Sequence, residues 1–433
     1  MYSLFNPVSN VSRQHDTIAF TNGGGHLGYI WHIWAYGKIP DVDPRTLWEF
    51  YQPPLYYLIC GYWVKFYTFL RIPALEAAEN IQFFSLFCVT GTGIVLDDIL
   101  RVCFAEKDKG NNSTRRRFFG LALVSVCPLF TYLGGSVNND AILLFSSTLS
   151  IFLLLKWFYK PTIVNIVILA LSVGLTVMSK NSGALIASGI LVIFIAKLIR
   201  EKNVKLFMQY LVFGMVSLPL GLWWNVRNVI RFQMPFLYFN PADKNSIQYI
   251  PQFTITERLF DLKDQINHLH IEIFNNSVNV DHNIFITTLK SIVFTCSAEV
   301  NLSIITKILG GILFVLLMLG SVFVVLFGFK GLFNKKYRIE IRISFVAIIV
   351  SYLVFYFQFI LKEPFVHTMH ARYIMPAMVF MIIMAVIGRD SIKVDKKEES
   401  LAKCRRGINI AAIILLGLVN ASYFALTTLM TYE

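Results

Sequence analysis

Residues 116–158 read RRFFGLALVSVCPLFTYLGGSVNNDAILLFSSTLSIFLLLKWF. Two mostly apolar runs make up this stretch, one over 116–135 and one over 141–158. Each is close to the roughly 20 apolar residues that a helix needs to cross the hydrocarbon core of a bilayer. The polar segment SVNND, residues 136–140, separates them. The stretch therefore predicts two membrane-crossing helices that meet at one membrane surface.

The composition of the whole chain extends this interpretation. Of the 433 residues, 56% are hydrophobic and 38 are phenylalanine, while only 15% are charged. Soluble domains carry about 25% charged residues. Only helices and closed barrels satisfy their backbone hydrogen bonds in lipid, and the apolar runs lack the strict alternation of barrel strands. The chain is predicted to be an all-α polytopic membrane protein.

About ten spans are predicted, and the positions of the basic residues orient them. The predicted spans are 80–104, 117–135, 140–159, 162–179, 182–199, 206–226, 302–328, 340–361, 372–388 and 407–428. When these alternate, five loops rich in lysine and arginine fall on one side, which is predicted to be cytoplasmic. The net charge of +13 follows from this distribution, so nucleic acid is not an expected partner. The six cysteines show no CxxC pairing, and we expect neither a disulfide framework nor a zinc site.

Four regions follow from this topology. Residues 1–79 form an outer-face loop and 80–228 the first part of the helical bundle. Residues 229–301 form an outer loop that caps the bundle, with helical patterning over 256–270, and 302–433 form the second part. The chain starts outside with no span before it, and a first span missing from this sequence is a natural explanation.

The apolar and aromatic segment 54–70 needs a separate interpretation. A single crossing there cannot connect two points that both lie on the outer side. The segment is therefore predicted to be a juxtamembrane helix on the outer leaflet, where aromatic residues and lysine are favoured. A true span, with the preceding topology shifted, is the alternative.

Two acids on the outer side are candidates for chemistry. Asp140 lies at the predicted outer edge of a span, where a carboxylate is costly and usually functional. The alternative is a structural cap, since Asn and Asp at a helix start bond free backbone N–H groups. Asp16 closes the segment RQHD, residues 13–16, and its alternative is a solvated loop acid. Together the acids suggest an enzyme that acts on lipid-linked substrates at the outer face.

Four cations near outer span ends are unexpected on that side, and a lipid phosphate is their obvious partner. They are Lys180, Arg227, Arg231 and Arg372. The alternative for each is extension of the side chain to lipid headgroups. We favour a functional role for Arg227 and Arg372, leave both open for Lys180, and expect headgroup contact for Arg231.

Neither a metal nor a cofactor is predicted. His367 and His370 stand three residues apart, but no third ligand is near in sequence, so structural contacts are the favoured interpretation. The glycine triplet at 23–25 follows no strand and has no accompanying Walker lysine, which argues against a nucleotide loop.

Several blocks together resemble the GT-C superfamily of membrane glycosyltransferases, specifically the dolichyl-phosphate-mannose protein mannosyltransferase-like group, glycosyltransferase family 39. The blocks are RQHD, GHLGYI with GKIPDVDPR, YQPPLYY, SVNNDA, MSKNSG, LWWNVRN and HARYIMP. Each is short, but their order and outer-side positions make the set fairly specific. They extend from about residue 13 to residue 376 and so cover most of the chain. The family usually has a span before its first-loop acid and an Asp-Glu pair there, whereas here Asp16 is followed by Thr17.

The resemblance implies a GT-C-like bundle with its active site at the outer face. It places the first-loop catalytic acid at Asp16, a second acid at Asp140, and an arginine after a central span at Arg227. It also implies a polyprenyl-phosphate sugar donor and transfer with inversion. The substrate-binding set predicted from the same blocks is His15, Asn139, Lys180, Arg227, Arg372 and Tyr373.

The predicted reaction is direct displacement at the sugar C1, with Asp16 as base, Asp140 orienting a substrate and the cations neutralising the departing phosphate. The acceptor is a protein, a lipid or a polymer, and membrane lipid surrounds the enzyme. A multi-pass protein of the plasma membrane is expected, or of the endoplasmic reticulum in a eukaryote. The alternatives are a lipid or polysaccharide transporter, and an inactive relative that binds lipid-linked sugars.

Overall fold

The computed structural model describes residues 24–105, 111–263, 265, 269, 281–294, 303–391 and 399–429. His15 and Asp16 therefore lie outside the described residues. Within those ranges the regular elements are helices, and the sole β pairing is an isolated antiparallel bridge between Tyr249 and Phe365. The predicted all-α class is confirmed.

Eight helical segments in the described ranges are long and apolar enough to cross a membrane, or up to nine if one bent pair counts as a span. They involve α3 (Ala74–Glu79) continuing into α4 (Ile81–Ala105), α7 (Asp140–Tyr159), η4 (Asn181–Ile186) with α9 (Ala187–Glu201), α10 (Val204–Phe232), α13 (Ile304–Phe333), α14 (Ile339–Lys362), η6 and η7 (Val366–Met369 and Ala371–Ile374) with α15 (Met375–Arg389), and α16 (Glu399–Leu429). A shorter apolar helix, α8 (Ile163–Ser179), covers the remaining predicted span. Each of the ten predicted spans thus falls on helix.

The predicted span 117–135 is not one straight helix. It consists of α5 (Asn111–Ser125) and α6 (Pro128–Gly134), whose apolar parts meet at an angle of 67°. The break falls directly before Pro128. Proline has no backbone N–H and its ring clashes with the preceding turn, so a helix is expected to end there and start again.

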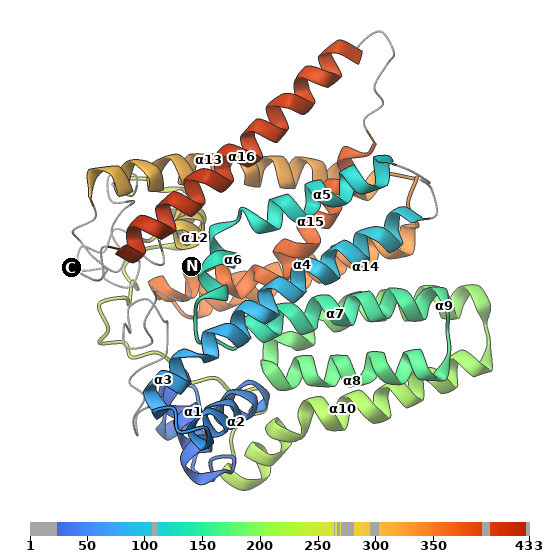
Figure 1. Cartoon of the computed structure of the whole chain (residues 1–433). Coiled ribbons are helices and arrows are strands. Elements are labelled where there is room, and N and C mark those ends of the chain that lie inside the picture. Colours follow the sequence, from blue (N-terminus) through green and yellow to red (C-terminus); the bar gives the residue numbers. More distant parts are fainter. Residues whose placement is uncertain are drawn as a thin grey trace. The chain divides into compact units, whose positions relative to one another are not determined.

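The chain divides into two compact units. The N-terminal unit contains the described residues up to Ile99 together with Leu133–Pro241, and the C-terminal unit contains Leu100–Tyr132 and Ala242–Glu433. In the N-terminal unit, α8 packs against both α7 and α10 (Figure 1). Side-chain hydroxyls join α7 to α8, with Ser150 Oγ lying 2.8 Å from Ser172 Oγ and 3.2 Å from Thr176 Oγ1. Such interhelical hydrogen bonds are a common means of association in membranes.

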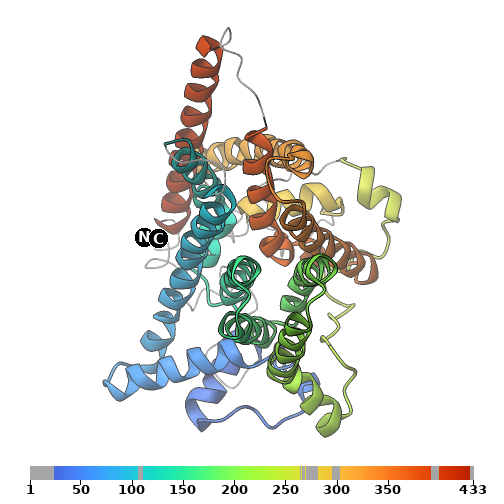
Figure 2. The same ribbon diagram turned by 90° about the vertical axis from the view of Figure 1, so that its right-hand side faces the viewer.

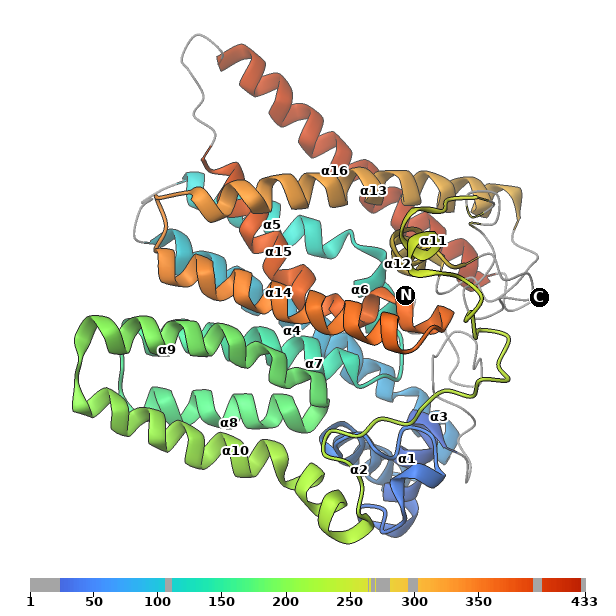
Figure 3. The ribbon, with the colours of Figure 1, turned by 180° about the vertical axis from the view of Figure 1, so that it is seen from behind.

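The N-terminal unit also contains α1 (Gly25–Tyr36) and α2 (Leu55–Phe69), which pack on each other (Figure 3). The contact is close because Gly61 has no side chain, and a Cβ there would lie 2.6 Å from the side chain of Ile33. Helix α2 covers the segment predicted to lie on the outer leaflet. It is not among the helices that qualify as spans, and its membrane position remains a prediction.

In the C-terminal unit, α13 packs against α15 and α14 also contacts α15 (Figure 2). Gly331 and Gly388 allow the first contact, since a Cβ on Gly388 would lie 1.8 Å from Phe327 O. The predicted cap contributes α11 (Ile255–Phe260) and α12 (Ile284–Val293). The helical pattern predicted over 256–270 therefore ends early, at Phe260, where the chain becomes extended at Asp261.

Candidate functional site

A buried ion pair at the start of α7 brings together two predicted site residues. Lys180 Nζ lies 2.6 Å from Asp140 Oδ1, and the two side chains are 12% and 2% exposed. Removal of one partner from a buried pair typically costs about 3–5 kcal/mol, because the other charge is left uncompensated. The pair therefore holds the carboxylate of Asp140 in a defined position at the helix start.

The segment SVNND folds this way because its asparagines satisfy nearby backbone groups. Asn138 Oδ1 accepts a hydrogen bond of 2.8 Å from Asp140 N. Asn139 Nδ2 donates to Ser179 O at 3.4 Å, which ties the start of α7 to the last residue of α8. The capping role is thus filled by Asn138, and the carboxylate of Asp140 is directed to Lys180.

Two buried oxygens of this segment, Asp140 Oδ2 and Asn139 Oδ1, have no hydrogen-bond partner among the described residues. Buried polar atoms are nearly always satisfied, so an unsatisfied one in a native structure requires an explanation. Both atoms are acceptors and cannot bind an anion. They are suited to the hydroxyl groups of a sugar or of an acceptor.

A hydrogen bond connects this ion pair to the end of α10. Asn225 Nδ2 donates to Asn181 Oδ1 at 2.9 Å, and Asn181 directly follows Lys180. Arg227 lies two residues after Asn225 on the same helix. The structure thus brings Asn139, Asp140 and Lys180 together and connects them, through Asn181 and Asn225, to the helix that carries Arg227.

Arg227 is held by a residue that sequence analysis did not single out. Its Nη2 atom lies 3.1 Å from Asp41 Oδ1 and 3.0 Å from Pro40 O, and its guanidinium lies 4.7 Å from the ring centre of Trp224. Arg231, for which headgroup contact was expected, also pairs with Asp41, through the second carboxylate oxygen. Asp41 belongs to the block GKIPDVDPR, so membership in a quoted block was the signal that pointed to it.

Tyr29 of α1 is a second residue that sequence analysis missed. Its ring stacks on Tyr57 at 4.0 Å between centroids and on Phe50 at 4.7 Å. Its hydroxyl is buried and has no hydrogen-bond partner among the described residues. Burial raises the pKa of Tyr29 strongly, and the positive charge of Arg227 opposes that rise. The hydroxyl therefore lies within the electrostatic influence of Arg227.

Glu49 is a third missed residue. It is 5% exposed and has a backbone φ of 68°, a left-handed conformation that is uncommon for a residue with a Cβ. Burial raises the pKa of Tyr57, and the charge of Glu49 raises it further. Strained backbone of this kind concentrates at functional sites, which makes Glu49 an additional candidate.

Arg372 and Tyr373 lie in the C-terminal unit, on η7. Arg372 is 7% exposed, its Nη2 atom donates to Tyr373 Oη at 3.2 Å, and its backbone N donates to His370 Nδ1 at 3.1 Å. The other histidine of the motif, His367, has its Nδ1 atom 2.9 Å from Gln248 Oε1. Both histidines thus take part in hydrogen bonds within the C-terminal unit. Within the described ranges, no three His, Cys, Asp or Glu side chains are grouped so as to hold a metal.

The cap positions the turn that carries Arg372. Ser291 Oγ of α12 accepts from Ala371 N at 2.8 Å. Tyr356 Oη donates to Met369 O at 2.7 Å and lies 2.6 Å from Thr288 Oγ1 of α12. Helix α12 therefore supports Ala371 directly and Met369 through Tyr356 of α14.

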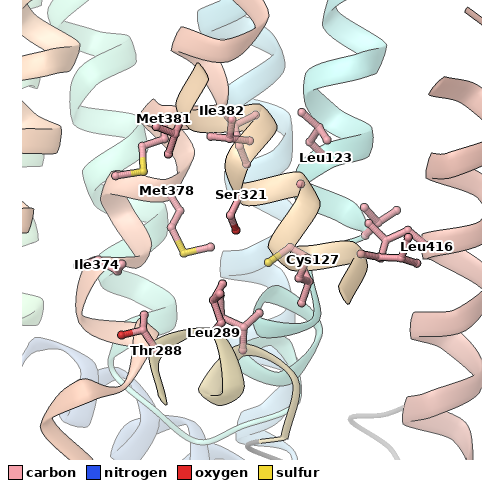
Figure 4. Close-up of a pocket in the computed structure, with 17 residues that line it drawn as sticks. Leu123, Cys127, Thr288, Leu289, Ser321, Ile374, Met378, Met381, Ile382 and Leu416 are labelled. Carbon is pink, nitrogen blue, oxygen red and sulfur yellow. The ribbon is translucent and has the colours of Figure 1, made fainter. Parts of the chain in front are cut away.

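An apolar pocket of the C-terminal unit begins beside this turn (Figure 4). Ile374, the last residue of η7, contributes to its wall together with Leu289 of α12 and Met378 of α15. Among its lining residues, side-chain hydroxyls come from Thr288 and Ser321 alone. The pocket is therefore suited to hydrocarbon and not to a sugar.

Comparisons with known proteins bear on the class of this chain. Residues 78–224 match the family model described as dolichyl-phosphate-mannose-protein mannosyltransferase. A search of solved structures matches the crystal structure of ArnT from Cupriavidus metallidurans in the apo state, at 12% identity and a TM-score of 0.38, over 89% of this chain and 76% of that chain. A search of curated proteins finds no match.

The helical bundle and the family match together define the class. They indicate a multi-pass integral membrane protein in which residues 78–224 are similar to membrane mannosyltransferases of the matched family. The family model covers the segment with Asn139, Asp140 and Lys180 and ends before Arg227. Within the class, the match is to the dolichyl-phosphate-mannose protein mannosyltransferase family, as the sequence blocks predicted.

Proposed function

We propose that this protein transfers a sugar from a polyprenyl-phosphate donor to an acceptor hydroxyl at the extracytoplasmic face, with inversion at the sugar C1. The acceptor is a protein, a lipid or a polymer. The observation that carries the proposal is the buried Asp140–Lys180 pair with the unsatisfied oxygens of Asp140 and Asn139. The next residue, Asn181, is hydrogen-bonded to the helix that bears Arg227. An acid near a fixed cation is the pairing that the reaction needs, because a hydroxyl must be oriented while a phosphate departs.

Each bond change in the proposed reaction has an assigned group. The acceptor oxygen forms a bond to C1 while the bond between C1 and the phosphate oxygen breaks. Asp16 takes the proton of the acceptor hydroxyl. Arg227 stabilises the polyprenyl phosphate that leaves, and Asp140 orients a sugar or acceptor hydroxyl through its unsatisfied oxygen.

The remaining predicted residues have supporting roles in this proposal. Lys180 fixes Asp140, and Asn139 offers a second acceptor to the same hydroxyl cluster. His15 precedes the proposed base and Tyr373 is bonded to Arg372. Positive side chains supply the charge that the departing phosphate requires, so no metal is assigned a step.

The test is sugar transfer by the purified protein from a panel of labelled polyprenyl-phosphate sugars to candidate acceptors. Asp16→Asn should retain the fold, whereas Asp140→Asn leaves Lys180 without its partner and is read only together with the stability of the variant. Asp16→Asn should reduce kcat by about 10²- to 10⁴-fold, the usual contribution of a positioned base. Asp243→Asn is the matched control, because Asp243 is an exposed acid of the predicted outer loop. Undiminished transfer by Asp16→Asn would remove Asp16 from the reaction, and flux into vesicles without transfer would favour a transporter.

A further inference from the structure

Arg258 is a buried cation in the cap of the C-terminal unit. It lies on α11 and is 2% exposed. Its Nη1 atom donates to Ile360 O of α14 at 3.1 Å. Its Nε and Nη2 atoms are buried and have no hydrogen-bond partner in the part of the chain that the structure describes. Arginine stays protonated in proteins, so the cap encloses a positive charge whose donors are only partly used.

The two nitrogens without partners form one edge of the guanidinium group. The N–H bonds of Nε and Nη2 run nearly parallel, and this fork is the edge through which arginine holds an anion with two hydrogen bonds. The contact from Nη1 to Ile360 O uses the opposite side of the group and leaves the fork intact. The buried edge of Arg258 is therefore suited to a single anion.

The acids nearest to Arg258 in sequence are used by other groups. Glu257 precedes it, and Asp261 follows three residues later, a spacing at which opposite charges on a helix can pair. The Oε2 atom of Glu257 accepts from Thr254 N at 2.7 Å and from Thr254 Oγ1 at 2.8 Å. The Oδ2 atom of Asp261 lies 3.2 Å from His282 Nε2. Both carboxylates thus have other partners.

A second buried cation of the cap shows how such a charge is normally compensated. Lys290 is 0% exposed, and its Nζ atom lies 2.8 Å from Oδ2 of the equally buried Asp281. At Arg258, burial lowers the pKa of the guanidinium, and no acid within the described ranges opposes this effect. An isolated buried charge is costly until an opposite charge compensates it, so Arg258 requires an anion that comes from outside the protein.

The closed surroundings of Arg258 limit the size of this anion. Helix α11 contacts α12 (Figure 3), and Asn283 Nδ2 of α12 donates to Leu259 O and to Asp261 O, each at 3.2 Å. A lipid headgroup or an acceptor chain cannot reach a side chain that is 2% exposed unless the cap opens. A monatomic anion is small enough for such a site, and chloride is the one that physiological solutions supply.

We infer that the cap binds one chloride ion on the edge formed by Nε and Nη2 of Arg258. The ion compensates the buried charge and stabilises the contact between α11 and the end of α14. Ile360 packs in one apolar core with Tyr356 and Met369, so chloride also stabilises the support of the turn that carries Arg372. The inference goes beyond the proposed function, because it assigns a ligand that takes no part in sugar transfer.

The test is thermal unfolding of the full chain in detergent, in sodium chloride and in sodium gluconate at equal ionic strength. Gluconate is a monovalent anion that is too large for a closed site. The melting temperature of the parent protein should rise by about 1–2 °C for each tenfold increase in chloride above its Kd. It should not depend on the gluconate concentration.

Two variants locate the effect. Arg258→Met should abolish the dependence on chloride, and in gluconate it should unfold at or above the temperature of the parent, because an uncompensated charge has been removed. Lys263→Met is the matched control, since Lys263 is an exposed cation of the same segment, and it should keep the full dependence. In crystals of the parent protein grown with sodium bromide, anomalous scattering should place a bromide ion within hydrogen-bonding distance of Nε and Nη2 of Arg258.

Several results would overturn the inference. A melting temperature of the parent that does not respond to chloride would show that no such ion is bound. Full chloride dependence in Arg258→Met would place the ion elsewhere. If that variant unfolded below the parent in gluconate, the protein itself would compensate the charge. Stabilisation by sulfate and not by chloride would contradict the size of the site. None of these measurements uses a sugar substrate, so they are independent of whether the proposed transferase activity is found.

Discussion

Replacement of Lys180 by methionine separates the structural role of the buried pair from its chemical role. Lys180→Met keeps the length of the side chain but leaves Asp140, with its side chain 2% exposed, without the lysine at 2.6 Å. A buried charge left in this way typically costs about 3–5 kcal/mol, and the partial exposure of Lys180 places the expected loss near 3 kcal/mol. Thermal unfolding in detergent should therefore occur roughly 3 °C lower than in the parent protein.

The double variant Asp140→Asn with Lys180→Met should recover most of this stability. It removes both charges, and replacement of both partners of a buried pair is usually close to neutral. Sugar transfer should nevertheless stay low, because the carboxylate proposed to orient a hydroxyl is absent. The double-mutant cycle should give an interaction energy of about 2–3 kcal/mol. The reasoning is refuted if Lys180→Met unfolds at the parent temperature, or if the double variant is as unstable as the single one.

Three further predictions concern the support of the two units. Tyr356→Phe removes the hydroxyl that donates a hydrogen bond to Met369 O at 2.7 Å. It should lower stability by about 1–3 kcal/mol and raise KM for the sugar donor more than it changes kcat. The matched control is Tyr62→Phe, because the hydroxyl of Tyr62 is exposed. Gly388→Ala places a methyl group 1.8 Å from Phe327 O, so α13 and α15 must separate. The yield of folded protein should therefore be lower, and a normal melting temperature would contradict the close contact between the two helices. Burial, and to a lesser extent the charge of Lys38, lower the pKa of His32 below its ordinary value of 6.5. The unfolded chain therefore binds a proton more readily than the folded chain, so the contribution of His32 to stability should be complete above pH 6.5 and fall as the pH decreases. His32→Gln should abolish this contribution to the pH dependence.

Much of the bundle was predictable because length and apolar content alone determine where a helix can cross a membrane. The bend before Pro128 was harder to predict, because the apolar sequence continues across it and only the proline indicates a break in the helix. The early end of α11 at Phe260 has no proline or glycine to announce it in the sequence, and Arg258 Nη1 near that end donates to Ile360 O at 3.1 Å, a contact between residues 102 positions apart.

The candidate site was predictable in its members but not in its pairings. Asp140 and Lys180 were each noted at outer helix ends, yet their contact spans 40 positions and no local pattern encodes it. The bond from Arg227 to Asp41 spans 186 positions. An ordinary loop acid and an acid that meets two arginines look identical in sequence. The roles of His15 and Asp16 stay predictions.

The hydrogen bond from Asn225 to Asn181 links the end of α10 to the segment that carries Lys180. The end of α10 carries Arg227, which is proposed to hold the departing phosphate, and Lys180 fixes the carboxylate of Asp140. Thermodynamic linkage is reciprocal, so any shift of this helix end on anion capture that alters the acid must be matched by an equal effect in the reverse direction. The affinity for the sugar donor and the affinity for the acceptor would then depend on each other. A substitution that changes one affinity would change the other through the side chains of Asn225 and Asn181.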